Sequence, residues 1–193
     1  MKLGEKIFEL RKKYDCIVVG AGPMGIFTCY ELMLKRPDLK VLLIDKGNDI
    51  YNRKCPIIAK KISQCPKDMY GNSGCHPACS ITSGFGGAGA FSDGKFNITN
   101  EFGGWMDEYI SSEEVLELIR YVDGINLKHG APEEITDPTT LKVLEIERKG
   151  IAQGLKLLRS EVRHLGTEIN LKVLQSIFEE MKKCSKMTVG RTE

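Results

Sequence analysis

The sequence of 193 residues has no marked excess of charge of either sign. It contains 28 lysine and arginine residues against 26 aspartate and glutamate residues, which gives a formal net charge of +2. Proteins that bind nucleic acid or anionic membranes usually carry a basic patch or stripe. The sequence shows no such stripe, so its composition argues against nucleic acid and against an anionic membrane as partners.

The chain also has no apolar run long enough to cross a bilayer. Its longest apolar, uncharged stretch, Cys16 to Tyr30, follows Arg11, Lys12 and Lys13 as an export signal would. A membrane helix needs about 20 apolar residues, and glycines and a proline interrupt the centre of this stretch. We therefore expect a cytoplasmic protein. Its hydrophobic content of 41% and charged content of 28% are ordinary for a globular protein.

The stretch that follows Tyr14 has the order of a dinucleotide-binding unit. An apolar, β-prone run, Cys16 to Val19, leads into three closely spaced glycines and an amphipathic segment. A second apolar run, Val41 to Ile44, then ends on Asp45. Strand, glycine-rich turn, helix, strand and acid in this order are typical of a βαβ unit that binds a dinucleotide.

Each part of this unit has its own expected task. Gly20 permits a tight turn, Gly22 allows the backbone to approach a pyrophosphate, and Gly25 lets the helix lie against the strand. Pro23 suits the first helical turn, whose free N–H groups would face the pyrophosphate. Asp45 is placed to accept hydrogen bonds from the ribose hydroxyls, and its charge would repel the 2′-phosphate of NADP.

A second glycine-rich segment lies between residues 80 and 99. Its glycines alternate with Phe85, Phe91 and Phe96. Such a segment is costly to order unless its backbone needs unusual dihedral angles or a close approach. We expect it to approach the bound nucleotide; a flexible linker is the alternative, which the regularly placed aromatic residues disfavour.

The motifs VVGAGPMG, LLIDKG and GFGGAGAFSDGK resemble those of FAD-dependent dehydrogenases found in many bacteria, mostly uncharacterised, within the glutathione-reductase-like flavoproteins. The segment EVRHLGTE (161–168) is also similar to that group. The resemblance implies an α/β fold. Its Rossmann-like, FAD-binding βαβ unit would carry a glycine-rich loop and an appended, mainly helical α+β segment. We place the first domain at residues 1–104 and the second, on the substrate side, at 105–193.

FAD is the cofactor that this resemblance implies, and NAD(P)H is a possible electron donor. Lys95 would bring positive charge to the flavin and stabilise its anionic reduced form. No catalytic acid or base can be assigned, and no metal site is predicted. The residues expected around the cofactor, from the pyrophosphate to the ribityl and isoalloxazine end, are Gly20, Gly22, Pro23, Met24, Gly25, Asp45, Lys46, Gly87, Gly89, Ser92, Asp93 and Lys95.

The seven cysteines are an odd number for a disulfide framework. Cys55, Cys65, Cys75 and Cys79 lie between the two glycine-rich motifs, without the C-x2-C pairs usual for structural zinc and iron–sulfur sites. Three interpretations stay open for them: structural thiols, redox-active thiols beside the flavin, or metal ligands.

The C-terminal half predicts helices and one further strand. Ser111 and Ser112 read as the cap of one helix and Asp137-Pro138 as the start of another, while Thr167 opens a last helix. Residues 155–164 alternate as a strand does, and the residues after the last helix read as a polar tail. Only two strands of a parallel sheet are then accounted for. We therefore expect an incomplete sheet in the N-terminal portion of a longer flavoprotein.

The predicted function is that of an FAD-dependent oxidoreductase with an unknown substrate. By itself the chain would be marginally stable, prone to association, weak in binding FAD and inactive. Two alternatives remain: an NAD-binding oxidoreductase without flavin, and a non-catalytic nucleotide-binding subunit whose fold a second chain completes.

Overall fold

The computed structural model describes residues 13–101 and 103–191, which form a mixed α/β structure. Within this part of the chain, no helix is both long and apolar enough to span a membrane. In chain order the elements are β1 (Cys16–Val19), α1 (Pro23–Lys35), β2 (Val41–Asp45), η1 (Gly87–Phe91), β3 (Lys95–Ile98), η2 (Met106–Glu108), α2 (Ser112–Lys128), α3 (Leu141–Ile151), β4 (Glu161–His164), α4 (Gly166–Lys183) and β5 (Met187–Arg191).

These elements form two compact units. The first comprises the described residues within Met1–Phe91 and Leu174–Glu193, and the second comprises Ser92–Val173. The chain thus leaves the first unit after η1 and returns to it within α4. The domain boundary predicted between residues 104 and 105 stays a prediction.

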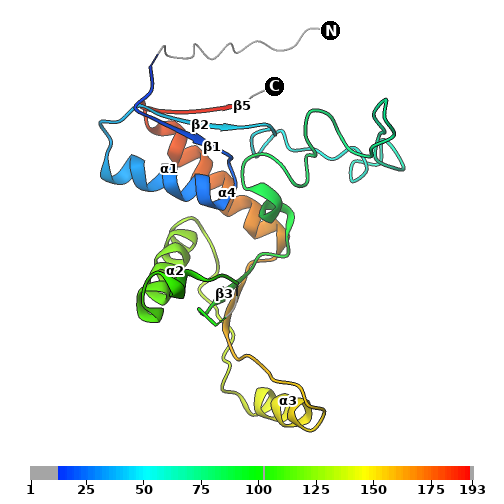
Figure 1. The fold of residues 1–193 in the computed structure, drawn as a ribbon, viewed down its shortest axis with the longest axis vertical. Coiled ribbons are helices and arrows are strands. Elements are labelled where there is room, and N and C mark those ends of the chain that lie inside the picture. Colours follow the sequence, from blue (N-terminus) through cyan, green and yellow to red (C-terminus); the bar gives the residue numbers. More distant parts are fainter. Residues whose placement is uncertain (1–12, 102, 192–193) are drawn as a thin grey trace. The chain divides into compact units, whose positions relative to one another are not determined.

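The first unit contains a parallel sheet with the strand order β1-β2-β5 (Figure 1). Helix α1 connects β1 to β2, and α4 precedes β5. Cys16 pairs with Val41, and Val41 pairs with Met187, so the three strands start level with one another. The first half of a doubly wound nucleotide-binding sheet has this order, with the third strand outside the second. The unit is therefore Rossmann-like.

The strand β5 corrects the prediction that only two strands of this sheet are present. Residues Met187–Arg191, predicted as part of a polar tail, pair in parallel with β2 along its whole length. The central strand β2 is consequently covered on both edges, by β1 and by β5. Thr188 and Val189 supply the β-branched side chains that suit a strand.

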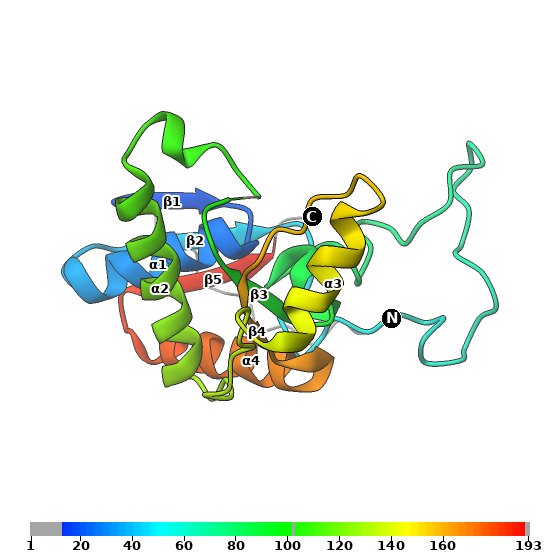
Figure 2. The same ribbon diagram turned by 90° about the horizontal axis from the view of Figure 1, so that it is seen from below.

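The core of the first unit lies on the face of the sheet that α1 covers. Ile26, Tyr30 and Leu43 are at most 1% exposed, as are Ile177 and Met181 of α4. Figures 1 and 2 show α1 and the C-terminal part of α4 side by side against the three strands.

The other face of β1 is open. There Ile17 is 56% exposed and Val19 is 80% exposed. Among the described residues, β1 pairs with β2 only.

The second unit contains an antiparallel pair of strands, β3 and β4, in which Phe96 is paired with Arg163. Helix α2 packs near β3 and begins as predicted: Ser111 caps it, and the side chain of Glu114 accepts a hydrogen bond from the Ser111 N–H. The predicted strand over 155–164 is wrong before Glu161, where the structure has an irregular segment.

The predicted start of α3 at Asp137-Pro138 is also wrong. Thr140 caps the helix, which begins at Leu141, because the carboxylate of Asp137 instead accepts hydrogen bonds from the N–H and hydroxyl of Thr139. These bonds close a local turn before the helix starts.

A buried ion pair holds the second unit together. The guanidinium of Arg163 on β4 donates from Nε and Nη2 to the two carboxylate oxygens of Asp123 on α2, both at 2.7 Å. Arg163 is 5% exposed and Asp123 is 9% exposed. The Asp123 carboxylate raises the pKa of Arg163. Because both groups are buried, loss of one would leave the other without a counter-charge.

We predict that Asp123→Ala lowers the free energy of unfolding of the second unit by about 3 kcal/mol, since it leaves a buried guanidinium uncompensated. Urea denaturation followed by circular dichroism measures this. Glu147→Ala is the matched control, because Arg159 and Glu147 form a similar pair nearer the surface. Equal losses in the two variants would contradict the assigned role of the Asp123–Arg163 pair.

Candidate nucleotide-binding site

The turn between β1 and α1 has the geometry of an anion-binding helix start. Gly20 has a φ of +100°, a conformation that favours glycine. Gly22 is the N-cap residue and Pro23 is the first helical residue. The helix has no side-chain cap and no acidic residue in its first turn. Its first N–H groups and the positive end of its dipole are therefore available to an anion.

Gly25 is required by the packing of α1 on β1. A Cβ atom at this position would lie 1.9 Å from the carbonyl oxygen of Gly20 and 3.3 Å from Cγ1 of Val18. At Gly22, by contrast, a Cβ atom would have no neighbour within 4 Å. Internal packing therefore explains Gly25 and leaves open space in front of Gly22, where a ligand can approach.

The carboxylate of Asp45 lies directly at the glycine turn. Its Oδ2 accepts a hydrogen bond of 2.8 Å from the N–H of Ala21, and its Oδ1 accepts one of 2.7 Å from the N–H of Gly47. The end of β2 is thereby tied to the start of α1. A carboxylate has about four lone-pair sites, so each oxygen keeps one for a further donor.

The second glycine-rich segment packs on the same turn. The N–H of Gly86 donates to the carbonyl of Ala21 at 2.8 Å. A Cβ atom at Gly87 would lie 3.2 Å from Cα of Gly22, and one at Gly47 would lie 2.3 Å from the N atom of Gly84. The backbones of three separate segments thus meet around the turn. The expected approach of this segment to a bound nucleotide stays a prediction.

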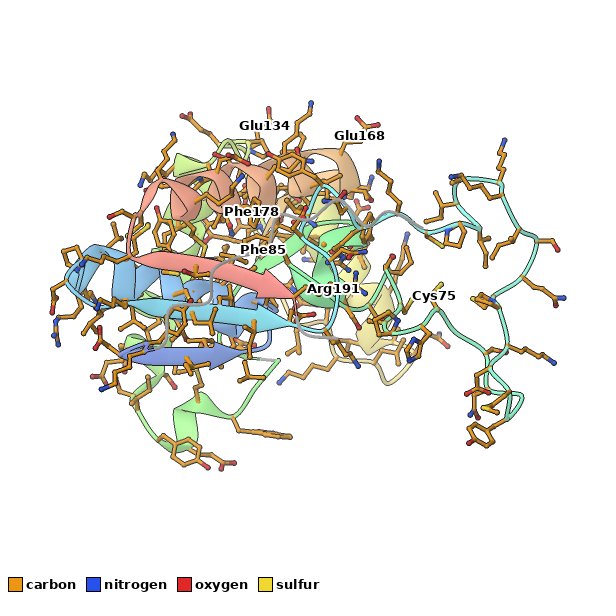
Figure 3. The ribbon with its side chains drawn as sticks, turned by 90° about the horizontal axis from the view of Figure 1, so that it is seen from above. Cys75, Phe85, Glu134, Glu168, Phe178 and Arg191 are labelled. Atoms are coloured by element: carbon orange, nitrogen blue, oxygen red, sulfur yellow. The ribbon has the colours of Figure 1, made fainter. Side chains whose placement is uncertain are left out.

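A pocket of about 180 Å³ opens beside Asp45, at the carboxyl ends of β2 and β5. In open α/β sheets this edge is where ligands bind. The rings of Phe85 and Phe178 meet edge to face, with their centroids 4.8 Å apart, and form an apolar wall (Figure 3). The lining residues are Ala21, Asp45, Gly47, Asn48, Asp49, Asn52, Phe85, Phe178, Val189, Gly190 and Arg191.

The remaining predicted site residues have different positions. In the first unit, Met24 is 83% exposed at the start of α1, Lys46 is exposed beside Asp45, and Gly89 lies within η1. Ser92, Asp93 and Lys95 belong to the second unit, where Lys95 Nζ and Asp93 form an exposed ion pair of 2.8 Å. Their roles toward a flavin stay predictions.

Of the residues that line the pocket, only Asp45 was predicted from the sequence as a cofactor contact, and Phe178 and Arg191 are two of those that were missed. Phe178 lies on the predicted face of the last helix and was read as core, although its ring also borders the pocket. Arg191 ends β5, pairs in register with Asp45, and donates from Nη1 to Oδ1 of Asn48 at 2.8 Å (Figure 3). The signal that could have found Arg191 is its place after a short β-branched run.

In the described part of the chain, no group of three or more His, Cys, Asp or Glu side chains is arranged to hold a metal ion. Comparison with known proteins gives little further guidance. No protein-family model matches the sequence.

The chain is similar to an uncharacterized protein of Clostridium beijerinckii, with 30% identity over 154 residues. The match covers 80% of this chain and 24% of that relative, so the chain spans about a quarter of its length. Among solved structures, the L-amino acid deaminase from Proteus vulgaris matches over 94% of this chain and 40% of its own, at 12% identity and a TM-score of 0.36. A likeness that low carries no argument about function.

We predict that Gly25→Ala destabilises the first unit by at least about 2 kcal/mol, because the added methyl group meets backbone atoms that cannot move aside. Gly124→Ala is the control. Gly124 lies within α2, where a Cβ atom has no neighbour within 4 Å, so alanine there should stabilise the helix by about 0.5–1 kcal/mol. Urea unfolding of both variants measures the difference; a neutral Gly25→Ala would show that α1 and β1 lie further apart.

Proposed function

We propose that this chain binds the adenosine diphosphate half of FAD and forms the nucleotide-binding part of an FAD-dependent oxidoreductase. The observation that carries the proposal is the carboxylate of Asp45, hydrogen-bonded to the N–H of Ala21 beside an uncapped helix start. In such a site the acid that binds the ribose must lie next to the helix start that binds the pyrophosphate. Here Asp45 accepts a hydrogen bond from Ala21, the residue directly before the N-cap Gly22.

The helix start supplies the pyrophosphate half of the site. Open space in front of Gly22 admits the two phosphate groups, and the N–H groups of Met24 and Gly25 have no partner within the helix. No acidic side chain in this turn repels the anion. Gly87 borders this open space on one side, and as a glycine it has no side chain that would fill the space.

Asp45 and the adjacent pocket supply the adenosine half. The two free lone-pair sites of the carboxylate match the two hydroxyls of a ribose. Beyond it, the aromatic wall of Phe85 and Phe178 suits a flat heterocycle such as adenine, since rings prefer offset or edge-to-face contact. The residues of the first unit thus fit an adenosine diphosphate group.

The choice of FAD over NAD rests on the motif resemblance, because both cofactors contain adenosine diphosphate. When bound, the flavin supplies the redox chemistry, while the protein binds it, orients it and sets the charge around it. We further propose that a strand from elsewhere, in this polypeptide or in a partner chain, pairs with the open edge of β1, as a doubly wound sheet requires.

We predict that Asp45→Asn weakens the binding of ADP about 10-fold to 100-fold, since it removes a charge-assisted hydrogen bond to the ribose. Isothermal titration calorimetry of the 193-residue chain measures the dissociation constant. Asp38→Asn is the control, because Asp38 is an exposed carboxylate that pairs with Arg36 and lines no part of the pocket.

Equal affinity of the wild type and Asp45→Asn for ADP would contradict the proposed ribose contact. Titration with adenosine 2′,5′-bisphosphate extends the test, because a carboxylate at this position should disfavour the 2′-phosphate. Tighter binding of that compound than of ADP would assign the pocket to an NADP-like ligand, with Arg191 as its phosphate contact. Flavin absorption in purified protein, against NAD binding to a colourless preparation, separates the two cofactor alternatives.

A further inference from the structure

The second unit contains a pocket of its own, where helix α2 packs on strand β3 (Figure 1). Its volume is about 250 Å³, and all of its lining residues belong to this unit. An apolar cavity of about 150 Å³ can hold benzene, so this one has room for an apolar molecule of about ten non-hydrogen atoms. We call it the α2–β3 pocket. Its apolar walls are formed by Phe96 and Ile98 of β3 and by Val115, Leu118, Ile119 and Val122 of α2.

Two polar side chains line the α2–β3 pocket toward the C-terminal end of α2. Asp123 and Asn126 follow the apolar wall residues of this helix and, three positions apart, lie on one face of it. The third polar lining residue, Asn97, is exposed and alternates with Phe96 and Ile98, which places its side chain on the opposite face of β3. An apolar pocket in which a few polar groups converge is the usual form of a small-molecule site.

The side-chain amide of Asn126 has an unused donor. Its Nδ2 atom is buried and has no hydrogen-bond partner among the described residues, and Asn126 as a whole is 3% exposed. A buried donor without a partner is costly, and few such groups occur in folded proteins. An amide turns readily about its Cβ–Cγ bond, so this donor can follow an acceptor that enters the pocket. A bound molecule would therefore supply the hydrogen bond that the protein lacks.

The charges next to Asn126 indicate which head group suits the pocket. Each carboxylate oxygen of Asp123 accepts one hydrogen bond from Arg163, which balances its charge and leaves a lone-pair site on each oxygen. A carboxylate on the ligand would be repelled by Asp123, and an ammonium group would be repelled by Arg163. An uncharged hydroxyl meets neither repulsion. It can accept a hydrogen bond from Asn126 and donate one to Asp123.

We propose that the α2–β3 pocket binds a small, uncharged, hydroxylated apolar molecule. The apolar body of the ligand lies between the side chains of α2 and those of β3. Its hydroxyl oxygen accepts from Nδ2 of Asn126, and its hydroxyl proton is donated to the carboxylate of Asp123. Because every lining residue belongs to the second unit, this proposal does not depend on the nucleotide site of the first unit.

The test measures the binding of 2-naphthol to the 193-residue chain at pH 7 by isothermal titration calorimetry, with naphthalene as a ligand that lacks the hydroxyl. Asn126→Leu should weaken the binding of 2-naphthol about tenfold, since it removes one hydrogen bond, and should not weaken the binding of naphthalene. A mere collapse of the pocket would weaken both ligands alike. The charged analogue 2-naphthoate should bind to the wild type about tenfold more weakly than 2-naphthol does.

A second variant tests the pocket from a position that is not part of the buried core. Leu118 is 47% exposed, so Leu118→Trp adds bulk at the edge of the pocket and should abolish the binding of both 2-naphthol and naphthalene. Arg120→Ala is the control. Arg120 is exposed on the same helix and does not line the pocket, so this variant should bind both ligands as the wild type does.

Three results would overturn the proposal. One is a wild-type chain that does not bind 2-naphthol, and another is an unchanged affinity of Asn126→Leu or Leu118→Trp for this ligand. The third is association of the chain with itself that Leu118→Trp abolishes, measured by analytical ultracentrifugation. That result would assign the α2–β3 pocket to a contact between protein chains.

Discussion

The two hydrogen bonds accepted by Asp45 are the constraint on which the rest of the first unit depends. One joins the end of β2 to the turn after β1, and the other fixes the backbone that leaves the sheet at Gly47. That backbone packs directly on Gly84, and from there the chain reaches Ala21 through the N–H of Gly86. Three segments far apart in sequence are thereby held around one helix start, at which we propose that a diphosphate binds.

The same arrangement connects the candidate nucleotide site to the cysteine segment. Arg53 donates to the carbonyl of Phe85, whose ring forms one wall of the pocket, and also to the carbonyls of Ser80 and Ile81, which directly follow Cys79. The guanidinium thus holds the loop that carries Cys79 on one side and the pocket wall on the other.

The βαβ unit was predictable because its signals are local: an apolar run, glycines at a fixed spacing and an acid at the end of the next run. The strand β5 was not, because its five residues follow Lys182, Lys183 and Lys186, and its order comes from pairing with the buried strand β2. The start of α3 at Leu141 was not predictable, because the turn that Asp137 forms with Thr139 moves the start of the helix past Pro138. The contacts of Arg53 and Arg191 could not be predicted, since their partners are distant in sequence.

The central claim is that a diphosphate binds at the start of α1 while Asp45 holds the adjoining ribose. An amide-resolved NMR titration of the 15N-labelled chain with ADP tests it most directly. The account predicts that the N–H signals of Ala21, Gly22 and Met24 in the turn, and of Gly47 beside Asp45, shift most and saturate at one common ADP concentration. The claim would be contradicted if saturating ADP left these four signals in place, whether or not other signals shifted.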